Sequence, residues 1–313
     1  MRVLVAGATS TLGGPVVRAL SERGHEVVAL TRSRTAADAF RQGGDRAAVA
    51  DVLDREAVAT AVREAAPEAV VSLLIALPRR GPMRVSHFRE TVRLWSEGVP
   101  NLVHAARDAG ARRFVGESVV FAYGYGRYGT APLDETSPLD DAEVVRGQRS
   151  ILAALRTMER RVLAAQGIDG IVLRYGLFHG RDVPSSRFLR RMVERRAMAL
   201  PGGGDALLSW IEIEDAARAT ADALERGSAG ELYNVVDDAP VRFRDYTSAL
   251  AAQLGVRPPR SVPMWLGRLA TPYAAAILGH TELPVSNAKA RRDLGWSPAV
   301  ATYREAVAQI AAA

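Results

Sequence analysis

The sequence predicts an α/β protein built on a doubly wound parallel sheet, with a smaller, mostly helical C-terminal lobe. Short apolar runs rich in β-branched residues alternate with helical patterns through the first two-thirds of the 313 residues. Most of these runs are apolar on both faces, as expected for strands that helices cover on both sides. The first run, Arg2–Ala6, leads directly into a glycine-rich turn and a helix. Alternation of this kind is typical of a parallel sheet.

Seven strands are expected from these short runs. They are Arg2–Ala6, Glu26–Leu30, Ala47–Ala50, Ala69–Leu73, Arg113–Glu117, Gly170–Arg174 and Glu231–Val236. Helical patterns fill the intervals between them. The clearest helices are Pro15–Arg23, Asp54–Ala65, Asn101–Ala109 and Gly147–Gln166.

The pattern changes after the sixth strand, and this change predicts two lobes. Residues 1–178 and 209–238 should form the sheet domain, and residues 179–208 and 239–313 a substrate lobe over its carboxyl edge. Within the second lobe, Thr271–His280 is apolar with proline and glycine near its ends. Such a segment suits either a mobile lid or an ordinary buried helix.

Composition excludes several classes of protein. The chain is 48% hydrophobic and 24% charged, which is typical of a globular protein, and it has no cysteine for disulfides or thiolate chemistry. No apolar run is long enough to span a membrane, and the five histidines have no metal-ligand spacing. A strand-like segment begins at Arg2, so no signal peptide and a cytoplasmic location are expected. The oligomeric state is left open.

Basic residues outnumber acidic ones by 41 to 35, but no nucleic-acid motif accompanies the charge. The arginines are scattered over the predicted helices, which favours solvated surfaces over a nucleic-acid partner. Lys289 is the one lysine, so the other 40 basic residues among the 41 are arginine.

The turn after the first strand, Gly7 to Gly13, predicts a dinucleotide site. Glycines there let the backbone approach a pyrophosphate, and the following helix N-terminus offers free N–H groups and about half a positive charge. Ser10 stands between the two glycines, where many such turns have a third. A simple tight turn is the alternative, but the strand before and the helix after favour the nucleotide.

The second strand ends without the acidic residue that NAD-preferring sites place near the ribose 2′-hydroxyl. Arg32, Ser33 and Arg34 stand there instead and could bind a 2′-phosphate through charge-assisted hydrogen bonds. NADPH is therefore the expected cofactor, with NADH possible. Asp51 and Val52 follow the third strand, placed either to contact adenine or, for Asp51, to cap the next helix.

With these residues the chain resembles the extended short-chain dehydrogenase/reductases of the epimerase/dehydratase family, which have a Rossmann-like fold. Six segments carry the resemblance, and their order and spacing are more specific than any one alone. They are Ala6–Gly13 (like TGATGxxG), Arg113–Gly124 (RFVYxSSxxVYG), Leu173–Gly180 (LRPGxVYG), Trp210–Asp215 (FVHVDD), Tyr233–Val235 (YNV) and Ser286–Pro298 (SNAKAxxxLGWxP).

The resemblance and the turn together give a set of expected cofactor contacts. Leu74 and Ile75 replace the small residues common in the family, which should make the pocket floor bulkier, and Tyr175–Leu177 should supply backbone near the nicotinamide. The full set is Gly7, Thr9, Ser10, Thr11, Leu12, Gly13, Arg32, Ser33, Arg34, Asp51, Val52, Leu74, Ile75, Ala76, Glu117, Ser118, Tyr175, Gly176 and Leu177.

The family's catalytic triad, a Ser/Thr with Tyr-x-x-x-Lys, is missing. Alignment on Glu159 puts Ile151 at the tyrosine position and Leu155 at the lysine position, and counting back from Tyr123 puts Val119 at the Ser/Thr position. Because Lys289 is the only lysine, no shift of the alignment restores the pair.

Ser118, Tyr123 and His179 remain as candidate catalytic groups, each with a structural alternative: the end of a strand, loop packing, or packing at the pocket rim. Glu117 is expected to be a cofactor contact or a buried, hydrogen-bonded structural carboxylate. Contacts to a flat substrate are expected from Val119, Tyr123, Phe178, His179 and Trp210, although Phe178 and Trp210 also suit ordinary core packing.

The resemblance implies an NADPH-dependent ketoreductase acting on a bulky aromatic ketone. Triad-lacking ketoreductases of angucyclinone-type polyketide pathways fit this description, and a phenol of the substrate could stabilise the alkoxide. One alternative is a non-catalytic NADP(H)-binding sensor or regulator. Another is a nucleotide-sugar epimerase or dehydratase, which the missing tyrosine and lysine disfavour.

Overall fold

The computed structural model describes residues 1–312 and has one seven-stranded parallel sheet with the strand order β11-β6-β5-β4-β1-β2-β3. The predicted α/β class and all seven predicted strands are confirmed, within one or two residues at each end. The strands are β1 (Arg2–Ala6), β2 (Glu26–Thr31), β3 (Arg46–Val49), β4 (Ala69–Ser72), β5 (Arg113–Val119), β6 (Asp169–Tyr175) and β11 (Leu232–Val235).

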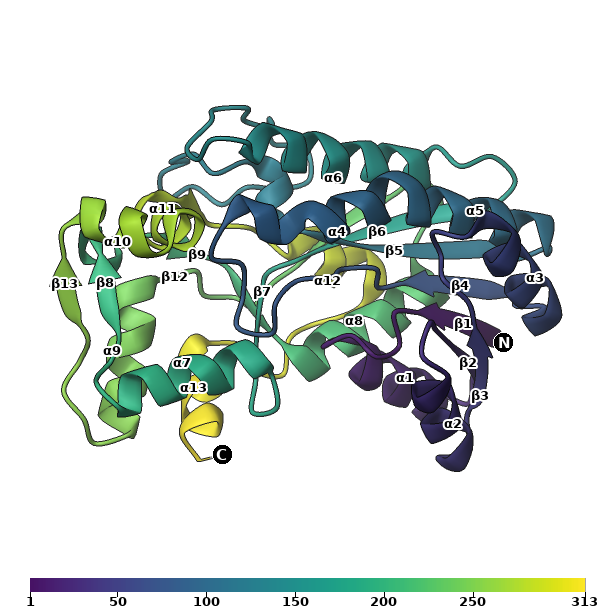
Figure 1. Cartoon of the computed structure of the whole chain (residues 1–313), viewed down its shortest axis with the longest axis horizontal. Coiled ribbons are helices and arrows are strands. Elements are labelled where there is room, and N and C mark those ends of the chain that lie inside the picture. Colours follow the sequence, from purple (N-terminus) through teal and green to yellow (C-terminus); the bar gives the residue numbers. More distant parts are fainter. Residues whose placement is uncertain (313) are drawn as a thin grey trace.

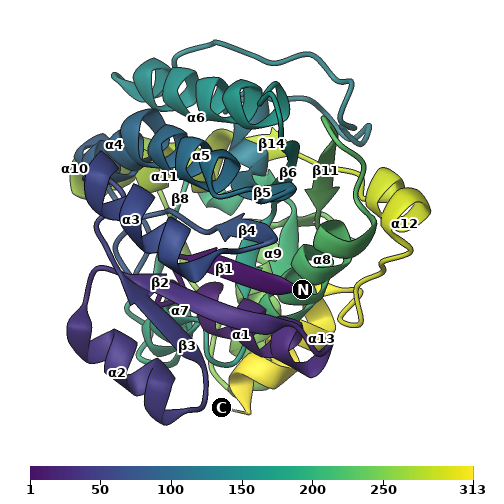
Figure 2. The ribbon, with the colours of Figure 1, turned by 90° about the vertical axis from the view of Figure 1, so that its right-hand side faces the viewer.

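Helices cover both faces of the sheet, which is why the strands are apolar on both sides (Figure 2). One face carries α3 (Arg55–Ala65), α5 (Val99–Asp108) and α6 (Gln148–Leu163); the other carries α1 (Gly13–Glu22) and α8 (Ile213–Arg226). Helix α2 (Arg34–Gln42) lies beside the edge strand β3. The helix α4 (Arg89–Arg93) continues through a π-helical turn, Leu94–Gly98, into α5.

Polar side chains fix where these helices begin. The Ser33 hydroxyl accepts a hydrogen bond from the Ala36 N–H at the start of α2. The Asp54 carboxylate accepts two, from Glu56 and Ala57, at the start of α3. Asp54, not Asp51, is therefore the cap of that helix, and the Asp51 carboxylate accepts a hydrogen bond from the Leu53 N–H in the loop before it.

Most of the remaining elements lie beyond the sheet, at the left of Figure 1. They form three small sheets, β10-β7, β12-β9-β14 and β13-β8, with helices around them. The strands are β7 (Leu177–His179), β8 (Ala199–Pro201), β9 (Leu207–Leu208), β10 (Trp210–Glu212), β12 (Val241–Arg242), β13 (Arg260–Val262) and β14 (Glu282–Leu283). The helices are α7 (Pro184–Glu194), α9 (Phe243–Gln253), α10 (Met264–Ala270), α11 (Pro272–His280), α12 (Ala288–Leu294) and α13 (Tyr303–Ala311).

Part of the C-terminal stretch does not belong to the smaller lobe to which the sequence assigned it. Helix α12 packs on α8 and β11, and Trp296 is buried in the same cluster as α1 and α8. The Trp296 indole N–H donates to the Asp215 carbonyl. Residues 288–296 therefore close the sheet layer.

Helix α11 is a buried helix in this structure. Tyr273 is 2% exposed, its ring lies 4.9 Å from that of Phe88, and its hydroxyl lies 2.6 Å from that of Tyr125. These contacts hold α11 against the connections that follow β4 and β5, where Phe88 and Tyr125 lie. No helix among residues 1–312 is both long and apolar enough to cross a membrane.

Candidate active site

The glycine-rich turn brings β1, α1 and the end of β4 unusually close together. Gly7 has φ +82°, and a Cβ there would lie 2.2 Å from the carbonyl oxygen of Leu73. A Cβ on Gly13 would lie 2.4 Å from the carbonyl oxygen of Ala8. The Ser10 hydroxyl accepts a hydrogen bond from the Gly13 N–H, so the serine supports the turn from within. The N-terminus of α1 is thereby presented at the carboxyl edge of the sheet.

A cleft of about 470 Å³ opens at this edge, between the ends of β1, β2, β3 and β4. Ten of the predicted cofactor contacts line it: Gly7, Thr9, Ser10, Thr11, Arg32, Asp51, Val52, Leu74, Ile75 and Ala76. Successive strands are added on one side of β1 up to β3 and on its other side from β4 onward. Open α/β sheets bind their ligands at such a reversal of strand order, here between β1 and β4.

Several predicted contacts are not part of this lining. Leu12 is 1% exposed and packs in the core, Gly13 is the first residue of α1, and Ser33 caps α2. Arg34 is exposed at the start of α2. Glu117, Ser118, Tyr175, Gly176 and Leu177 lie further along the sheet edge, on and after β5 and β6.

Other residues line the cleft that the sequence did not single out. Arg79 follows β4, and Asp182 and Pro184 come from the opposite side, at the start of α7. The rest are Leu30, Thr31, Ala50, Leu73, Leu77 and Leu94. Leu30, Ala50 and Leu73 end predicted strands, so the sequence indicates their position, but nothing local marks Arg79, Leu94 or Asp182.

The cleft combines features that suit a dinucleotide phosphate. Its glycine turn and helix N-terminus favour a pyrophosphate. Arg32 forms an ion pair with Glu90 at 3.5 Å, but its side chain is 67% exposed, and an exposed pair of this kind is weak enough for the guanidinium to turn toward a ligand. Arg79 adds a second cation, and Asp51 faces the space beyond β3. The residues present therefore fit an NAD(P) cofactor.

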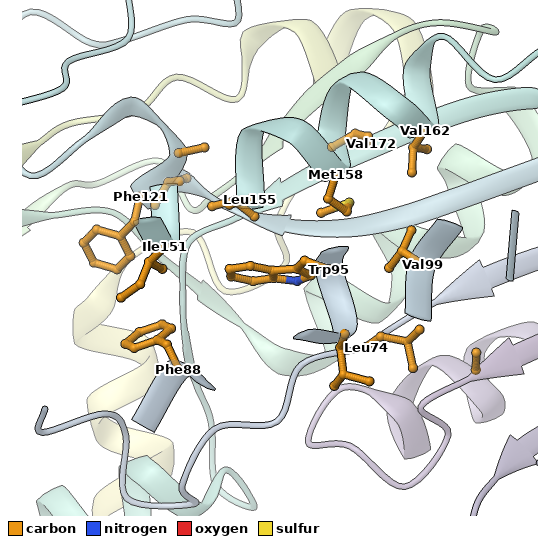
Figure 3. Packing of buried hydrophobic residues seen from close by; sticks show 14 of the residues in the cluster. Leu74, Phe88, Trp95, Val99, Phe121, Ile151, Leu155, Met158, Val162 and Val172 are labelled. Carbon is orange, nitrogen blue, oxygen red and sulfur yellow. The ribbon is translucent and has the colours of Figure 1, made fainter. Parts of the chain in front are cut away.

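The three positions of the missing triad are aliphatic, and two of them are enclosed. Ile151 and Leu155 are 3% and 1% exposed on α6. Figure 3 shows them among Phe88, Trp95, Phe121 and Met158, in the packed layer between α6 and the sheet. No acid or base stands at these positions to donate a proton to a substrate.

Ser118 and Tyr123 are held in a buried polar network. The Ser118 hydroxyl donates to Glu159 Oε1 at 2.5 Å, and Arg174 donates to both Glu159 oxygens at 2.8 and 2.6 Å. The Arg174 guanidinium lies 4.6 Å from the Tyr123 ring centroid. Burial raises the pKa of Tyr123, whose hydroxyl donates to the Asp134 carbonyl.

His179 is equally enclosed, at 0% exposure. Burial lowers the pKa of its imidazole to about 3, so the ring is neutral at physiological pH. It lies beside Trp210, which stacks on Tyr246 with ring centroids 4.4 Å apart. Trp210 is 7% exposed and packs in the core, whereas Phe178 is half-buried against Tyr175. In this structure the three candidate proton donors, Ser118, Tyr123 and His179, present no accessible polar atom.

Glu117 is buried, as expected, but it is not hydrogen-bonded. Its Oε2 is enclosed and has no partner among residues 1–312, and burial raises the pKa of the carboxyl to about 8.

Lys289, by contrast, has its charged group paired. Its ammonium donates to Glu231 Oε2 at 2.5 Å and to the Leu232 carbonyl at 2.8 Å. The one lysine is therefore committed to a structural contact beside β11.

Comparison with known proteins agrees with this geometry. The model of the NAD dependent epimerase/dehydratase family matches residues 3–236. A 3-diazoavenalumate denitrifying reductase from a Streptomyces species is 38% identical over 309 residues, covering 97% of this chain and 98% of the relative. A 4-hydroxy-2-methyl-3-oxo-4-farnesyl-3,4-dihydroquinoline-1-oxide ketoreductase from Stigmatella aurantiaca is 27% identical, covering 95% and 92%.

Solved structures share the fold. The UDP-glucose 4-epimerase of Thermus thermophilus, in complex with NAD, has a TM-score of 0.79 at 22% identity and covers 100% of this chain and 98% of its own. A human epimerase family protein with NADPH has a TM-score of 0.77 at 22% identity, covering 100% and 99%. The family match and the two reductase relatives indicate an NAD(P)-dependent oxidoreductase. The chain belongs to the NAD dependent epimerase/dehydratase family.

Proposed function

We propose that the protein is an NADPH-dependent ketoreductase that reduces a bulky aromatic, polyketide-type ketone to an alcohol without a Ser-Tyr-Lys triad. The observation that carries this is the contrast between a fully formed cofactor cleft and a triad replaced by Val119, Ile151 and Leu155. A protein that keeps the cofactor cleft can still position a hydride donor. Without the triad it lacks the usual proton donor.

The sizes of two catalytic contributions, general acid catalysis and the positioning of the reactants, support reduction without that donor. General acid catalysis contributes about 10²–10⁴-fold to a rate. Holding two reactants in register supplies roughly 7–11 kcal/mol, which is considerably more. When bound, NADPH supplies the hydride, which adds to the carbonyl carbon. A phenol next to the ketone can stabilise the alkoxide oxygen by an internal hydrogen bond, so the protein itself need supply no acid.

The chain's residues have distinct roles in this proposal. The Gly7–Gly13 turn holds the pyrophosphate, Arg32 and Arg34 bind the 2′-phosphate, and Asp51 contacts the adenosine end. The backbone of Tyr175–Leu177 positions the nicotinamide. Phe178, half-buried beside Tyr175, offers an apolar face to a flat substrate. Likeness to the triad-lacking ketoreductases of angucyclinone-type pathways rests on the same missing residues.

A second acceptor class is favoured by the 38% identical relative, whose name describes the denitrifying reduction of a diazo compound. Hydride addition to the terminal nitrogen of a diazonium cation gives a neutral diazene. The diazene then loses dinitrogen, and its N–H proton ends on carbon. Because the acceptor is already cationic, no proton donor is needed, which is again compatible with the aliphatic triad positions.

The test is NADPH oxidation followed at 340 nm with hydroxylated aromatic ketones and with aryl diazonium compounds. Oxidation with ketones and formation of an alcohol supports the ketoreductase, and loss of both nitrogen atoms from the product supports the second acceptor class. Tight NADPH binding with no oxidation across both panels would instead favour a sensor or regulator. Conversion of a nucleotide sugar without net NADPH oxidation would indicate an epimerase or dehydratase.

A further inference from the structure

Glu117, at the carboxyl end of β5, is a buried carboxyl with no partner among the residues that the structure describes. The residue is only 7% exposed, and its Oε2 has no hydrogen bond among the described residues. An unpaired buried polar atom costs about 1–3 kcal/mol of stability. A group kept at that cost points to a partner that arrives from outside the chain.

The sheet register locates this carboxyl relative to the cofactor cleft. Ser72, the last residue of β4, pairs with Gly116, so Glu117 lies beside Leu73, which lines the cleft. Glu117 pairs with Leu173 on its other side and faces the same layer as Val115 and Tyr175. It therefore stands one strand beyond the inner end of the cleft.

The strand order fixes which end of a dinucleotide reaches this point. The pyrophosphate lies at the turn after β1, and the adenosine end lies over β2 and β3, where Arg32 and Asp51 line the cleft. The sheet continues in the opposite direction through β4, β5 and β6. The nicotinamide half must extend that way, over the ends of β4 and β5, because the other direction is already occupied.

We propose that the Glu117 carboxyl binds the carboxamide of the nicotinamide ring as a paired acid–amide contact, with the acid O–H donating to the amide oxygen and the amide N–H donating to the acid carbonyl oxygen. This inference rests on the proposed use of NADPH and names the group that orients its reactive ring. Glu117 is a cofactor-binding residue in this account, and it transfers no proton to the substrate.

The protonation state of the carboxyl matches the requirement for one donor and one acceptor. Burial raises the Glu117 pKa to about 8, so the group is neutral near pH 7. Burial is the sole cause of the shift, because no charged group of β4, β6, α6 or α8 contributes to it. Tyr175 on β6 is the titratable neighbour that responds to Glu117, and burial keeps its phenol neutral with its hydroxyl 2.8 Å from that of Thr220.

The test compares two ligands on purified full-length protein, NADPH and 2′-phospho-ADP-ribose, which lacks the nicotinamide. Dissociation constants are measured by calorimetry for wild type, E117Q and E117A. E117A should weaken NADPH by about tenfold or more and leave 2′-phospho-ADP-ribose within about twofold, since two hydrogen bonds to the carboxamide are lost. E117Q should bind NADPH like wild type near pH 7, because an amide reproduces both hydrogen bonds.

The pH dependence of NADPH binding separates this role from a merely structural one. Wild-type affinity should fall as the pH rises past about 8, where the carboxyl loses its donor, whereas E117Q affinity should stay flat. D237N is the matched control, because Asp237 also has an unpartnered buried oxygen and a pKa raised to about 8 but follows β11. D237N should leave NADPH affinity and its pH dependence unchanged.

Two results would overturn the inference: equal weakening of both ligands by E117A, or no effect of E117A on NADPH. A wild-type protein that binds neither ligand would instead reject the proposed cofactor itself, and with it this contact. Circular dichroism of each variant confirms that the fold is retained before binding is compared.

Discussion

The Ser118 hydroxyl donates a 2.5 Å hydrogen bond to Glu159, the residue that also forms both hydrogen bonds with the Arg174 guanidinium. The side chain of Ser118, the residue next to the usual catalytic position, therefore points into the layer between α6 and the sheet. Its neighbour Val119 stands at the aligned position, and neither can donate to a ligand. The polar groups that remain near the missing triad stabilise the fold.

Replacement of this serine should therefore affect stability more than catalysis. Ser118→Ala leaves one buried Glu159 oxygen with a partner fewer, and we expect a loss of about 1–3 kcal/mol in the free energy of unfolding. NADPH-dependent turnover should change less than about threefold. Urea unfolding and initial rates at 340 nm measure the two effects, and a rate loss of about 10² or more would restore Ser118 as a proton donor.

The buried ion pair should be worth far more than exposed pairs. Glu159→Ala leaves the 5% exposed Arg174 side chain without its counter-charge, and we expect a loss of about 3–5 kcal/mol in unfolding free energy. Glu97→Ala removes an ion pair of which both side chains are 54% exposed, and should cost less than about 1 kcal/mol. Similar costs for the two variants in urea unfolding would refute the distinction.

The close approach at Gly7 can be tested with a matched glycine. Gly7→Ala adds a Cβ at φ +82° that would lie 2.2 Å from the Leu73 carbonyl oxygen, so the turn must shift and NADPH affinity should fall by more than tenfold. Gly44→Ala has a similar strain, at φ +93°, but meets no atom within 4 Å. It should lower stability slightly and leave NADPH binding intact. If both variants bind NADPH equally well, the turn does not hold the pyrophosphate.

The 2′-phosphate assignment predicts a selective loss. The double variant Arg32→Ala/Arg34→Ala should weaken NADPH much more than NADH, by tenfold or more, because charge-assisted hydrogen bonds contribute about 1.5–3 kcal/mol each. Arg41→Ala, on the same helix, removes an exposed arginine bound to Asp38 and should change neither affinity. Equal loss of NADPH and NADH affinity in the double variant would reject the assignment.

Burial of His179 predicts a specific acid sensitivity. Its pKa is lowered to about 3 in the folded chain, against about 6.5 when unfolded, so the unfolded state binds more protons between these values. The stability contribution is complete above pH 6.5 and falls as the pH drops toward 3. His179→Phe should remove about 2 kcal/mol of the loss between pH 7 and pH 5 in urea unfolding. His104→Gln, on the surface of α5, should not; an unchanged slope in His179→Phe would contradict the burial effect.

Most of the fold was predictable because its signal is local. Apolar runs and glycine turns recur in strict order, so β1 to β6 and the Gly7–Gly13 turn followed from residue type alone. The missing triad followed from a count, since a chain with one lysine at position 289 has none to place on α6.

The direction of individual side chains was not predictable. Ser118 and Val119 differ by one residue, and strand alternation decides which faces Glu159. Asp182 reaches the cleft from the turn before α7, far along the chain, through packing that no local pattern encodes. For Glu117 the sequence predicts either a cofactor contact or a buried, hydrogen-bonded carboxylate, and only the packed structure reveals that its Oε2 has no partner among residues 1–312.

The central claim is that hydride transfer in this protein needs no acid from the chain. The direct measurement is the single-turnover rate of NADPH oxidation, followed at 340 nm by stopped flow, for Tyr123→Phe against wild type with an accepted aromatic substrate. The Tyr123 hydroxyl is buried and bonded to the Asp134 carbonyl, so the rate should stay within about threefold of wild type. A fall of about 10²-fold or more, with NADPH affinity and fold unchanged, would show that the tyrosine is the proton donor and would contradict the account.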